Sequence, residues 1–159
     1  MKQLLLFCVC ISICLLAMSC ATPEPEPKPE LTREVISTKD APAAIGPYSQ
    51  AIKVGNTLYL AGQIALDPET GKMVEGGIEA ETHRVMQNLQ AVLSAAGYAF
   101  TDVVQTQVFV SDMNNYGALN GIYSEYISDS PPARAVVEVA RLPRDAMVEI
   151  MMVAVKTAN

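Results

Sequence analysis

The sequence predicts an α+β fold in which a single mixed β-sheet carries two helices packed on one face. The first observation is the order of hydrophobic patterns along residues 34–157: strand, strand, strand, helix, strand, helix, strand, strand. The second is that each helix lies between two strands, and such crossovers place both helices on one side of a sheet. The third is a last strand that is apolar on both sides, which leaves the other sheet face without cover. A second subunit is the expected cover, so we predict an obligate oligomer.

The first third of the predicted domain holds three strands. A short strand is expected at Glu34–Ser37, and a loop rich in proline and glycine follows at Asp40–Tyr48. Strand patterns at Ser49–Val54 and Thr57–Ala61 flank Gly55-Asn56, a pair of residues that favours a tight hairpin turn. These two strands are therefore expected to pair in antiparallel fashion.

Two helices are predicted in the middle of the chain. The first covers Ile78–Ala96, where apolar residues recur every three or four positions and Gly97 is suited to the helix end. The second covers Asn115–Ile127, and the prolines at 131–132 prevent its continuation.

Three further strands are predicted at Val103–Val110, Ala135–Ala140 and Met147–Val155, the last two joined through a turn at Arg144–Asp145. In the first of these, side chains should alternate between the two faces of the sheet. We expect one face to hold Val104, Thr106, Val108 and Val110, and the other to hold Val103, Gln105, Gln107 and Phe109.

Composition narrows the possible chemistry. The chain has 159 residues, which suits one domain, and a net charge of −6 without a basic stripe, so nucleic acid is not an expected partner. All four cysteines lie within the first twenty residues, and His83 is the one histidine. The domain therefore lacks the residues for a thiolate metal site or a histidine-based nucleophile, and we expect neither a metal nor another cofactor.

The N-terminal segment has the features of a targeting sequence. Residues 1–20 combine an early lysine, a long apolar run and a cysteine, Cys20, which is the pattern of a lipoprotein signal peptide. Residues 21–33 are rich in proline and glutamate and favour an extended tether. We expect export and a lipid anchor at Cys20 in the cell envelope, with no other membrane contact. A plain signal peptide or an uncleaved anchor remains an alternative.

Two charged residues are candidates for a functional site, one just before a predicted apolar strand and one within another. Arg134 follows a Pro-Pro-Ala turn, and its planar guanidinium matches a carboxylate; a surface ion pair is the alternative role. Glu149 stands among apolar residues, where a carboxylate is costly to bury and tends to have a raised pKa suited to proton transfer. A purely structural pairing with an arginine is the other possibility for Glu149. Glu138 has a similar pattern and cannot be separated from Glu149 on this basis.

The motifs around these residues resemble those of the RidA (YjgF/YER057c) family from Ile36 to Lys156. They are Ala41–Tyr48, Ala61–Gln63, Val108–Val110 with Asp112, Pro132–Arg134, Val137–Pro143 and Val148–Ile150. The resemblance implies a YjgF-like, chorismate-mutase-like fold. It also implies a homotrimer with inward-facing sheets and clefts between its subunits.

The resemblance further implies hydrolysis of reactive enamines and imines, such as 2-aminoacrylate, 2-iminopropanoate and 2-iminobutanoate, to 2-keto acids and ammonia. In that case Arg134 binds the substrate carboxylate with help from the Gly62 N–H, and Glu149 orients water and carries its proton. Tyr48, Asn120 and the main chain of Val136 line the cleft, with Tyr48 supplied by the neighbouring subunit.

Two residues depart from the deaminases of this family. Ala61 stands where they have a serine, and Val136 stands where they have a cysteine, so substrate range or rate could differ. A trimeric module that binds 2-keto acids without catalysis is therefore an alternative function. The endoribonuclease or translation-inhibitor activity attached to some relatives is a weaker one, because the chain is acidic.

Overall fold

A computed structural model describes residues 32–127 and 130–157. The predicted signal peptide, its Cys20 and nearly all of the predicted tether lie outside the described residues. The tether was predicted to end at residue 33, but β1 (Arg33–Ile36) already begins there.

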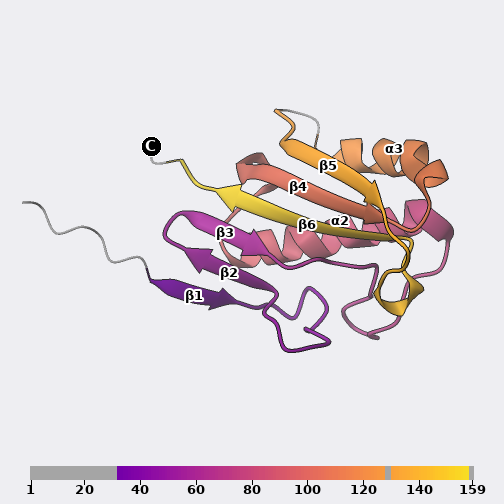
Figure 1. Ribbon diagram of the computed structural model, residues 1–159. Helices are drawn as coiled ribbons and strands as arrows, with labels where there is room; N and C mark the ends of the chain where they lie inside the picture. Colours follow the sequence, from indigo (N-terminus) through magenta and orange to yellow (C-terminus); the bar gives the residue numbers. More distant parts are fainter. Residues whose placement is uncertain (1–31, 128–129, 158–159) are drawn as a thin grey trace, which may run out of the picture. The chain divides into compact units, whose positions relative to one another are not determined.

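A six-stranded mixed sheet forms the centre of the domain (Figure 1). Its other strands are β2 (Ala51–Val54), β3 (Thr57–Leu60), β4 (Val103–Val110), β5 (Ala133–Glu138) and β6 (Val148–Val155). Their order is β1-β2-β3-β6-β4-β5, with β4 and β5 parallel and every other pair antiparallel. The last strand of the chain is thus inserted between β3 and β4.

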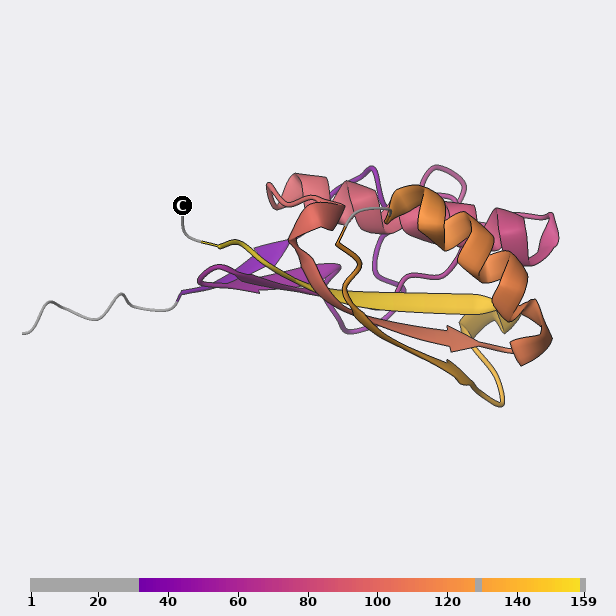
Figure 2. The same ribbon diagram turned by 90° about the horizontal axis from the view of Figure 1, so that it is seen from above.

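The two helices, α2 (Gly77–Ala95) and α3 (Tyr116–Tyr126), lie on the same face of this sheet (Figure 2). This confirms the predicted fold class, and the helix ends lie within one residue of the predicted ones. None of the helices in the described part of the chain is long and apolar enough to cross a membrane.

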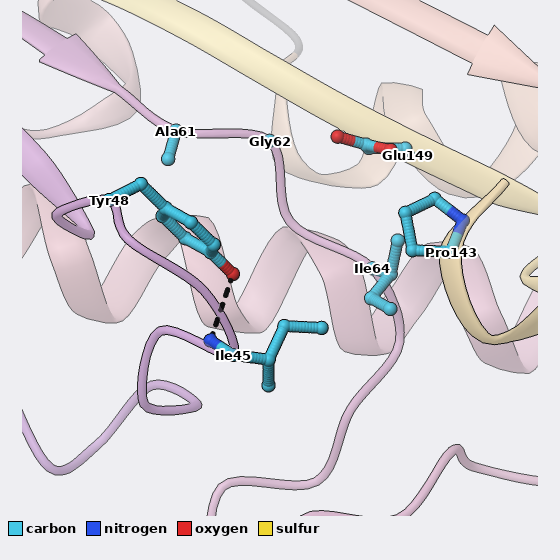
Figure 3. Close-up of a pocket in the computed structure, with 7 residues that line it drawn as sticks. All are labelled: Ile45, Tyr48, Ala61, Gly62, Ile64, Pro143 and Glu149. Carbon is cyan, nitrogen blue, oxygen red and sulfur yellow. Dashed lines mark hydrogen bonds between the residues drawn. The ribbon is translucent and has the colours of Figure 1, made fainter.

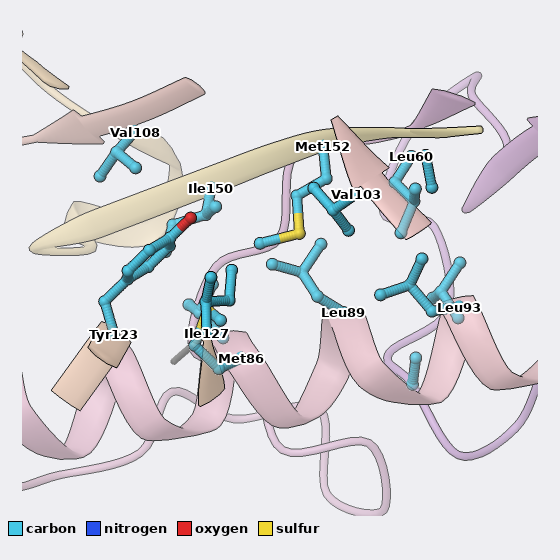
Figure 4. Packing of buried hydrophobic residues seen from close by; sticks show 14 of the residues in the cluster. Leu60, Met86, Leu89, Leu93, Val103, Val108, Tyr123, Ile127, Ile150 and Met152 are labelled. Carbon is cyan, nitrogen blue, oxygen red and sulfur yellow. The ribbon is translucent and has the colours of Figure 1, made fainter. Parts of the chain in front are cut away.

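The main core fills the layer between the helices and the sheet. In Figure 4, Met86 and Leu89 of α2 point toward Ile150 and Met152 of β6, while Leu93 lies below Leu60 of β3, and all six are almost fully buried. Replacing one of the buried leucines by alanine should cost about 2–5 kcal/mol of unfolding free energy, because a cavity would remain.

The alternation predicted for β4 is wrong at its first two residues. Val103 is buried in the core and Val104 is 48% exposed, the reverse of the expectation. The register between β4 and β6 shifts between Val103 and Gln105, which marks a β-bulge. One extra residue changes the face of every side chain before it, so the alternation is confirmed only from Thr106 onward.

The start of β5 also differs from the prediction. The strand begins at Ala133 and ends at Glu138, whereas Ala135–Ala140 was expected. Parallel pairing with β4 starts at Ala133 opposite Gln105, so Arg134 is part of the ladder and does not precede it. The turn before β6 is confirmed, with Arg144 and Asp145 both at positive φ.

No helix among the described residues covers the opposite face of the sheet (Figure 2), although Ile64 and Leu142 pack with Phe109 at one end of it. One row across it pairs Val35 with Ile52, Ile52 with Tyr59 and Tyr59 with Val153. Val35 and Tyr59 are each more than half exposed. An apolar surface of this kind is typical of a subunit interface, and the oligomer expected from the sequence stays a prediction.

Candidate functional site

A pocket of about 300 Å³ lies beside Glu149 (Figure 3). We call it the glutamate pocket, and it is lined by Ile45, Tyr48, Ala61, Gly62, Ile64, Pro143 and Glu149. Three separate segments supply these residues: the loop before β2, the segment after β3, and the end of the chain from Pro143 into β6. The fold therefore brings together Tyr48, Gly62 and Glu149, three of the residues predicted from the sequence.

Gly62 and Glu149 are in close contact within this pocket. Gln63 and Ile150 exchange two backbone hydrogen bonds, of 2.9 and 3.1 Å, which hold the segment after β3 against β6. A Cβ atom at Gly62 would overlap the Glu149 carboxylate, so glycine is needed here for close approach. The Gly62 N–H has no hydrogen-bond acceptor among the described residues, which leaves it as a donor for a ligand.

The Glu149 carboxylate is half-buried. Within residues 32–127 and 130–157, no hydrogen bond or ion pair is formed to it. Burial alone therefore raises the pKa of Glu149 above its ordinary value. A carboxylate in this state can accept and release a proton closer to neutral pH.

The loop that carries Tyr48 is anchored by a buried amide. Gln50 is 5% exposed, and its Nε2 donates to the carbonyl oxygens of Thr38, Ala41 and Pro42 at 3.0, 3.2 and 2.8 Å. Its Oε1 accepts a hydrogen bond of 2.6 Å from the Thr38 N–H. Gln50 was not recognised from the sequence, because a glutamine between Ser49 and Ala51, just before a strand, gives no local sign of burial.

Polar residues of α2 hold the other two segments of the glutamate pocket. The Glu81 carboxylate accepts a 2.8 Å hydrogen bond from the Met147 N–H, just before β6. Burial raises the pKa of Glu81, and the backbone hydrogen bonds of residues 147 and 148 partly oppose this shift. Asn88 Nδ2 donates to the carbonyl oxygens of Ile64 and Leu66 at 3.2 and 2.9 Å. One helix thus fixes both segments that meet at Glu149.

A second pocket, of about 330 Å³, surrounds Arg134. We call it the arginine pocket, and its lining residues are Asn120, Tyr123, Ser124, Ile127, Pro131, Pro132 and Arg134. It lies between the end of α3 and the start of β5. Arg134 and Asn120 are the two predicted site residues found here.

The Arg134 guanidinium is held by uncharged groups. Its Nη2 donates a 2.7 Å hydrogen bond to Asn120 Oδ1, and its carbon Cζ lies 4.6 Å from the centre of the Tyr123 ring. No carboxylate pairs with it among the described residues. Tyr116 lies beside Arg134 and Asn120. A hydrogen bond from Asn120 and the positive charge of Arg134 together lower the pKa of the Tyr116 hydroxyl. The positive charge therefore remains available to an anionic ligand.

Tyr123 was not recognised as a site residue from the sequence, which assigned it to the apolar face of its helix. Its hydroxyl donates a 3.2 Å hydrogen bond to Thr106 Oγ1, and this bond turns the ring beneath Arg134. The residue is 6% exposed, so it belongs to the core and to the arginine pocket together.

The register of the strands places Arg134 and Glu149 on opposite faces of the sheet. Arg134 pairs with Thr106, which pairs with Met152, and the last two are buried on the helix side. Glu149 pairs with Phe109, whose other partner is Val137 on the uncovered side. Because paired residues point to the same face, the two charged groups cannot meet within one chain.

The remaining predicted residues have other surroundings. Val136 lies on the same side of β5 as Arg134, packs against the main core and lines neither pocket. Glu138, the rival of Glu149, is exposed and accepts a 2.7 Å hydrogen bond from the Met113 N–H. His83 lies 3.1 Å from the Tyr126 hydroxyl, away from both pockets. Within the described residues, no group of three histidines, cysteines or carboxylates is placed to hold a metal ion.

Comparisons with known proteins cover most of the described domain. Residues 38–156 match the family model for Endoribonuclease L-PSP. A RutC family protein of Pyrococcus horikoshii is 51% identical over 124 residues, covering 78% of this chain and 98% of the relative. The 2-iminobutanoate/2-iminopropanoate deaminase of Mus musculus is 50% identical over 126 residues, covering 79% of this chain and 93% of the relative.

Solved structures have the same fold. The crystal structure of RidA from a Psychrobacter species superposes with a TM-score of 0.75 at 42% identity, covering 77% of this chain and 99% of the other. The structure of TdcF of E. coli, solved with bound serine, also has a TM-score of 0.75, at 33% identity, with coverage of 78% and 99%.

Proposed function

The chain belongs to the RidA (YjgF) family, and from this premise we propose that it hydrolyses reactive 2-imino acids and their enamine tautomers to 2-keto acids and ammonia. Relatives named 2-iminobutanoate/2-iminopropanoate deaminase support this proposal at 46–50% identity. The observation that carries it is the half-buried Glu149 carboxylate, which has no partner among the described residues and lies against the unpaired Gly62 N–H.

The complete site requires two chains. Arg134 and Glu149 face opposite sides of one sheet, so an arginine pocket can meet a glutamate pocket only between subunits. The apolar uncovered face supplies a surface for such an assembly. The proposed oligomer is a homotrimer with the uncovered faces turned inward, in which Tyr48, Gly62 and Glu149 come from one chain and Arg134 and Asn120 from its neighbour. Light scattering that found a monomer would exclude this arrangement.

The reaction then needs little beyond orientation and one proton carrier. Arg134 binds the carboxylate of the 2-imino acid, with the Gly62 N–H as a second donor. Water adds to the imine carbon as one of its protons passes through Glu149 to the imine nitrogen. The C–N bond of the resulting carbinolamine breaks, and its hydroxyl proton leaves with the nitrogen, so that one imine and one water give one keto acid and one ammonia.

A coupled assay tests this function. A serine or threonine dehydratase generates the imine in situ, and keto-acid release is followed with and without the purified protein. We expect acceleration by the wild-type protein and a loss of about 10²- to 10⁴-fold for Glu149→Gln, since general acid–base catalysis contributes that much. Glu138→Gln is the matched control, because Glu138 lies outside both pockets, and it should keep full activity. Absence of acceleration by a correctly assembled wild type would refute the proposal.

Binding without catalysis is the second candidate function. The serine bound in the structure of TdcF supports it, because a pocket of this family can hold an amino acid. In that case Glu149→Gln would leave ligand affinity unchanged, and no variant or wild type would accelerate imine hydrolysis. RNA cleavage, suggested by the name of the family model, is a weaker candidate for an acidic chain.

We also propose that the protein is exported and anchored to the cell envelope through a lipid on Cys20. The support comes from the sequence alone: an apolar run at Leu4–Ala17, a cysteine three residues after it, and then a stretch rich in proline. Cys20→Ala should release the protein from the membrane fraction and change its size on a gel. If the variant stays membrane-bound at an unchanged size, the anchor is of another kind.

A further inference from the structure

The turn that leads into β6 has a strained backbone and lies beside the glutamate pocket. We call residues 142–147 the Pro143 turn, because Pro143 lines the pocket next to Glu149 (Figure 3). Arg144 and Asp145, which follow each other in this turn, have φ values of 59° and 56°. Residues with a side chain rarely adopt this left-handed conformation, because the Cβ atom comes too close to a carbonyl oxygen. The Pro143 turn therefore needs surrounding contacts that hold it in this shape.

Apolar packing and a surface ion pair hold part of the Pro143 turn. Leu142 and Ala146 are buried and pack in one cluster with Ile64, a wall residue of the glutamate pocket. Arg141 Nε donates a 2.6 Å hydrogen bond to Asp145 Oδ1, but both side chains are exposed, so this ion pair contributes little. Apolar packing has no preferred direction. These contacts therefore do not by themselves fix the backbone where it enters β6.

The directional contact comes from Glu81 of α2. This residue is 7% exposed, and its Oε2 accepts a 2.8 Å hydrogen bond from the Met147 N–H, where the turn ends. The Met147 carbonyl oxygen accepts a 3.0 Å hydrogen bond from the Ser111 N–H. Glu149 thus lies between Met147 and Ile150, two residues whose backbone N–H and carbonyl groups are both hydrogen-bonded to other segments.

From these contacts we propose that Glu81 is a positioning residue for the reaction: its carboxylate holds the strained Pro143 turn at Met147, and Glu149 is thereby kept where it can carry the proton. The inference rests on the proposed hydrolase function and adds a residue to it. All of these contacts lie within one chain, so they do not depend on the second chain that completes the site. A proton carrier must lie within hydrogen-bond reach of the reacting atoms, and a shift of about 1 Å can lower the rate about 10²-fold.

Two conservative variants separate the reach of the Glu81 side chain from its charge. Glu81→Gln keeps an acceptor oxygen at the same distance along the side chain but loses the charge, and it should keep kcat within about 2-fold of the wild type. Glu81→Asp keeps the charge but is one carbon shorter, and it should lower kcat about 10- to 100-fold. Its KM should change less than about 3-fold, because the arginine pocket that binds the substrate carboxylate is untouched. Steady-state kinetics on the imine made in situ by a dehydratase would measure both values.

Thr82→Val is the matched control for these variants. Thr82 is a fully buried polar residue next to Glu81 on α2, but its hydroxyl donates a 2.7 Å hydrogen bond to the Ile78 carbonyl oxygen, within the same helix. Removing that hydroxyl disturbs the helix and leaves the Pro143 turn alone. The control should therefore keep the wild-type kcat and KM, even if its melting temperature falls.

A glycine in the turn tests whether Glu81 acts through the strain. Arg144 is exposed and lines neither pocket, and glycine adopts its positive φ without the steric cost. In the Glu81→Asp background, Arg144→Gly should therefore raise kcat about 5-fold, because the turn then keeps its shape with a weaker anchor. The same change should raise kcat less in the wild-type chain, where Glu81 already holds the turn.

The outcomes separate this inference from the function on which it rests. A wild type that accelerates the hydrolysis of no imine would refute the hydrolase function and, with it, the role of Glu81. A Glu81→Asp variant with a lower melting temperature but the wild-type kcat would retain the function and show that Glu81 only stabilises the fold. Equal losses in Glu81→Gln and Glu81→Asp would assign the effect to the charge, and no gain from Arg144→Gly would show that Glu81 does not act through the turn. Either of these results would overturn the inference.

Discussion

The arginine pocket and the glutamate pocket treat their charged groups in opposite ways. The Arg134 guanidinium lies over the Tyr123 ring and donates a hydrogen bond to the Asn120 amide oxygen. Neither group carries a negative charge, so the positive charge of Arg134 is not neutralised. Glu149 is pressed against a glycine and apolar side chains and gains no compensating partner among the described residues. The first arrangement stabilises a permanent charge for binding. The second makes the charged form of a carboxylate costly, which is the condition for proton transfer.

The two pockets are also held in place by different kinds of interaction. The arginine pocket depends on a core residue, Tyr123, and therefore on the packing of α3 against the sheet. The glutamate pocket depends on hydrogen bonds between loop backbone and the side chains of Gln50, Glu81 and Asn88. The binding half is thus fixed by hydrophobic packing, and the proton-transfer half by buried polar anchors.

The largest effect is expected at Arg134. Arg134→Ala removes the carboxylate clamp and should lower kcat/KM about 10²- to 10³-fold, mainly through KM. Arg134→Lys keeps the charge but loses the planar fork, so it should recover only part of this loss. Steady-state kinetics on the in-situ imine would measure both. Equal activity of the alanine variant and the wild type would remove Arg134 from the site.

Mixing two inactive variants tests whether the pockets combine between chains. Arg134→Ala and Glu149→Gln chains, refolded together in equal amounts, should regain about a quarter of the wild-type activity. Half of the chains keep Arg134 and the other half keep Glu149, so about one interface in four combines an intact Arg134 with an intact Glu149. The separately refolded variants are the controls. Activity no higher than in those controls would mean that each chain works alone or that the chains do not exchange.

Gly62→Ala should damage the glutamate half without touching the other. The added methyl overlaps the Glu149 carboxylate, so we expect about 1–3 kcal/mol of lost stability and about a 10²-fold lower kcat. Gly117→Ala is the matched control, because a Cβ at Gly117 in α3 has no neighbour within 4 Å. That variant should be active and slightly more stable, as alanine favours a helix. Thermal unfolding and kinetics together would show whether Gly62 tolerates the methyl.

The smallest expected effect is on the pH dependence of stability. The pKa of Glu149 is raised in the folded state, so the folded protein binds more protons than the unfolded chain between the ordinary value of 4.5 and the raised one. Stability from this group is present at low pH and falls as the pH rises through that window. Glu149→Gln should therefore gain stability relative to the wild type as the pH increases, and the difference should level off above the raised pKa. Melting temperatures from pH 4 to pH 8 that show a constant difference would contradict the raised pKa.

Much of the local structure could be predicted from the sequence. The hairpin at Gly55-Asn56, the apolar repeat of α2 and the prolines after α3 depend on short-range backbone and side-chain preferences, which act between neighbours in the chain. The same holds for Arg134 and Glu149, because a charged residue beside or within an apolar run is visible without any coordinates. The resemblance in motifs then supplied a chemical role for them, which remains a proposal.

By itself, then, the sequence determined the order of the elements, the fold class and two residues worth testing. Only the tertiary structure decided that β6 enters between β3 and β4, that a bulge turns Val104 outward, and that Tyr123 lies under Arg134. It also decided that Arg134 and Glu149 face opposite sides of the sheet. These facts depend on strand register and on contacts between residues far apart in the chain. A register shift of one residue moves every side chain of a strand to the other face of the sheet, and the preferences of neighbouring residues do not determine the register.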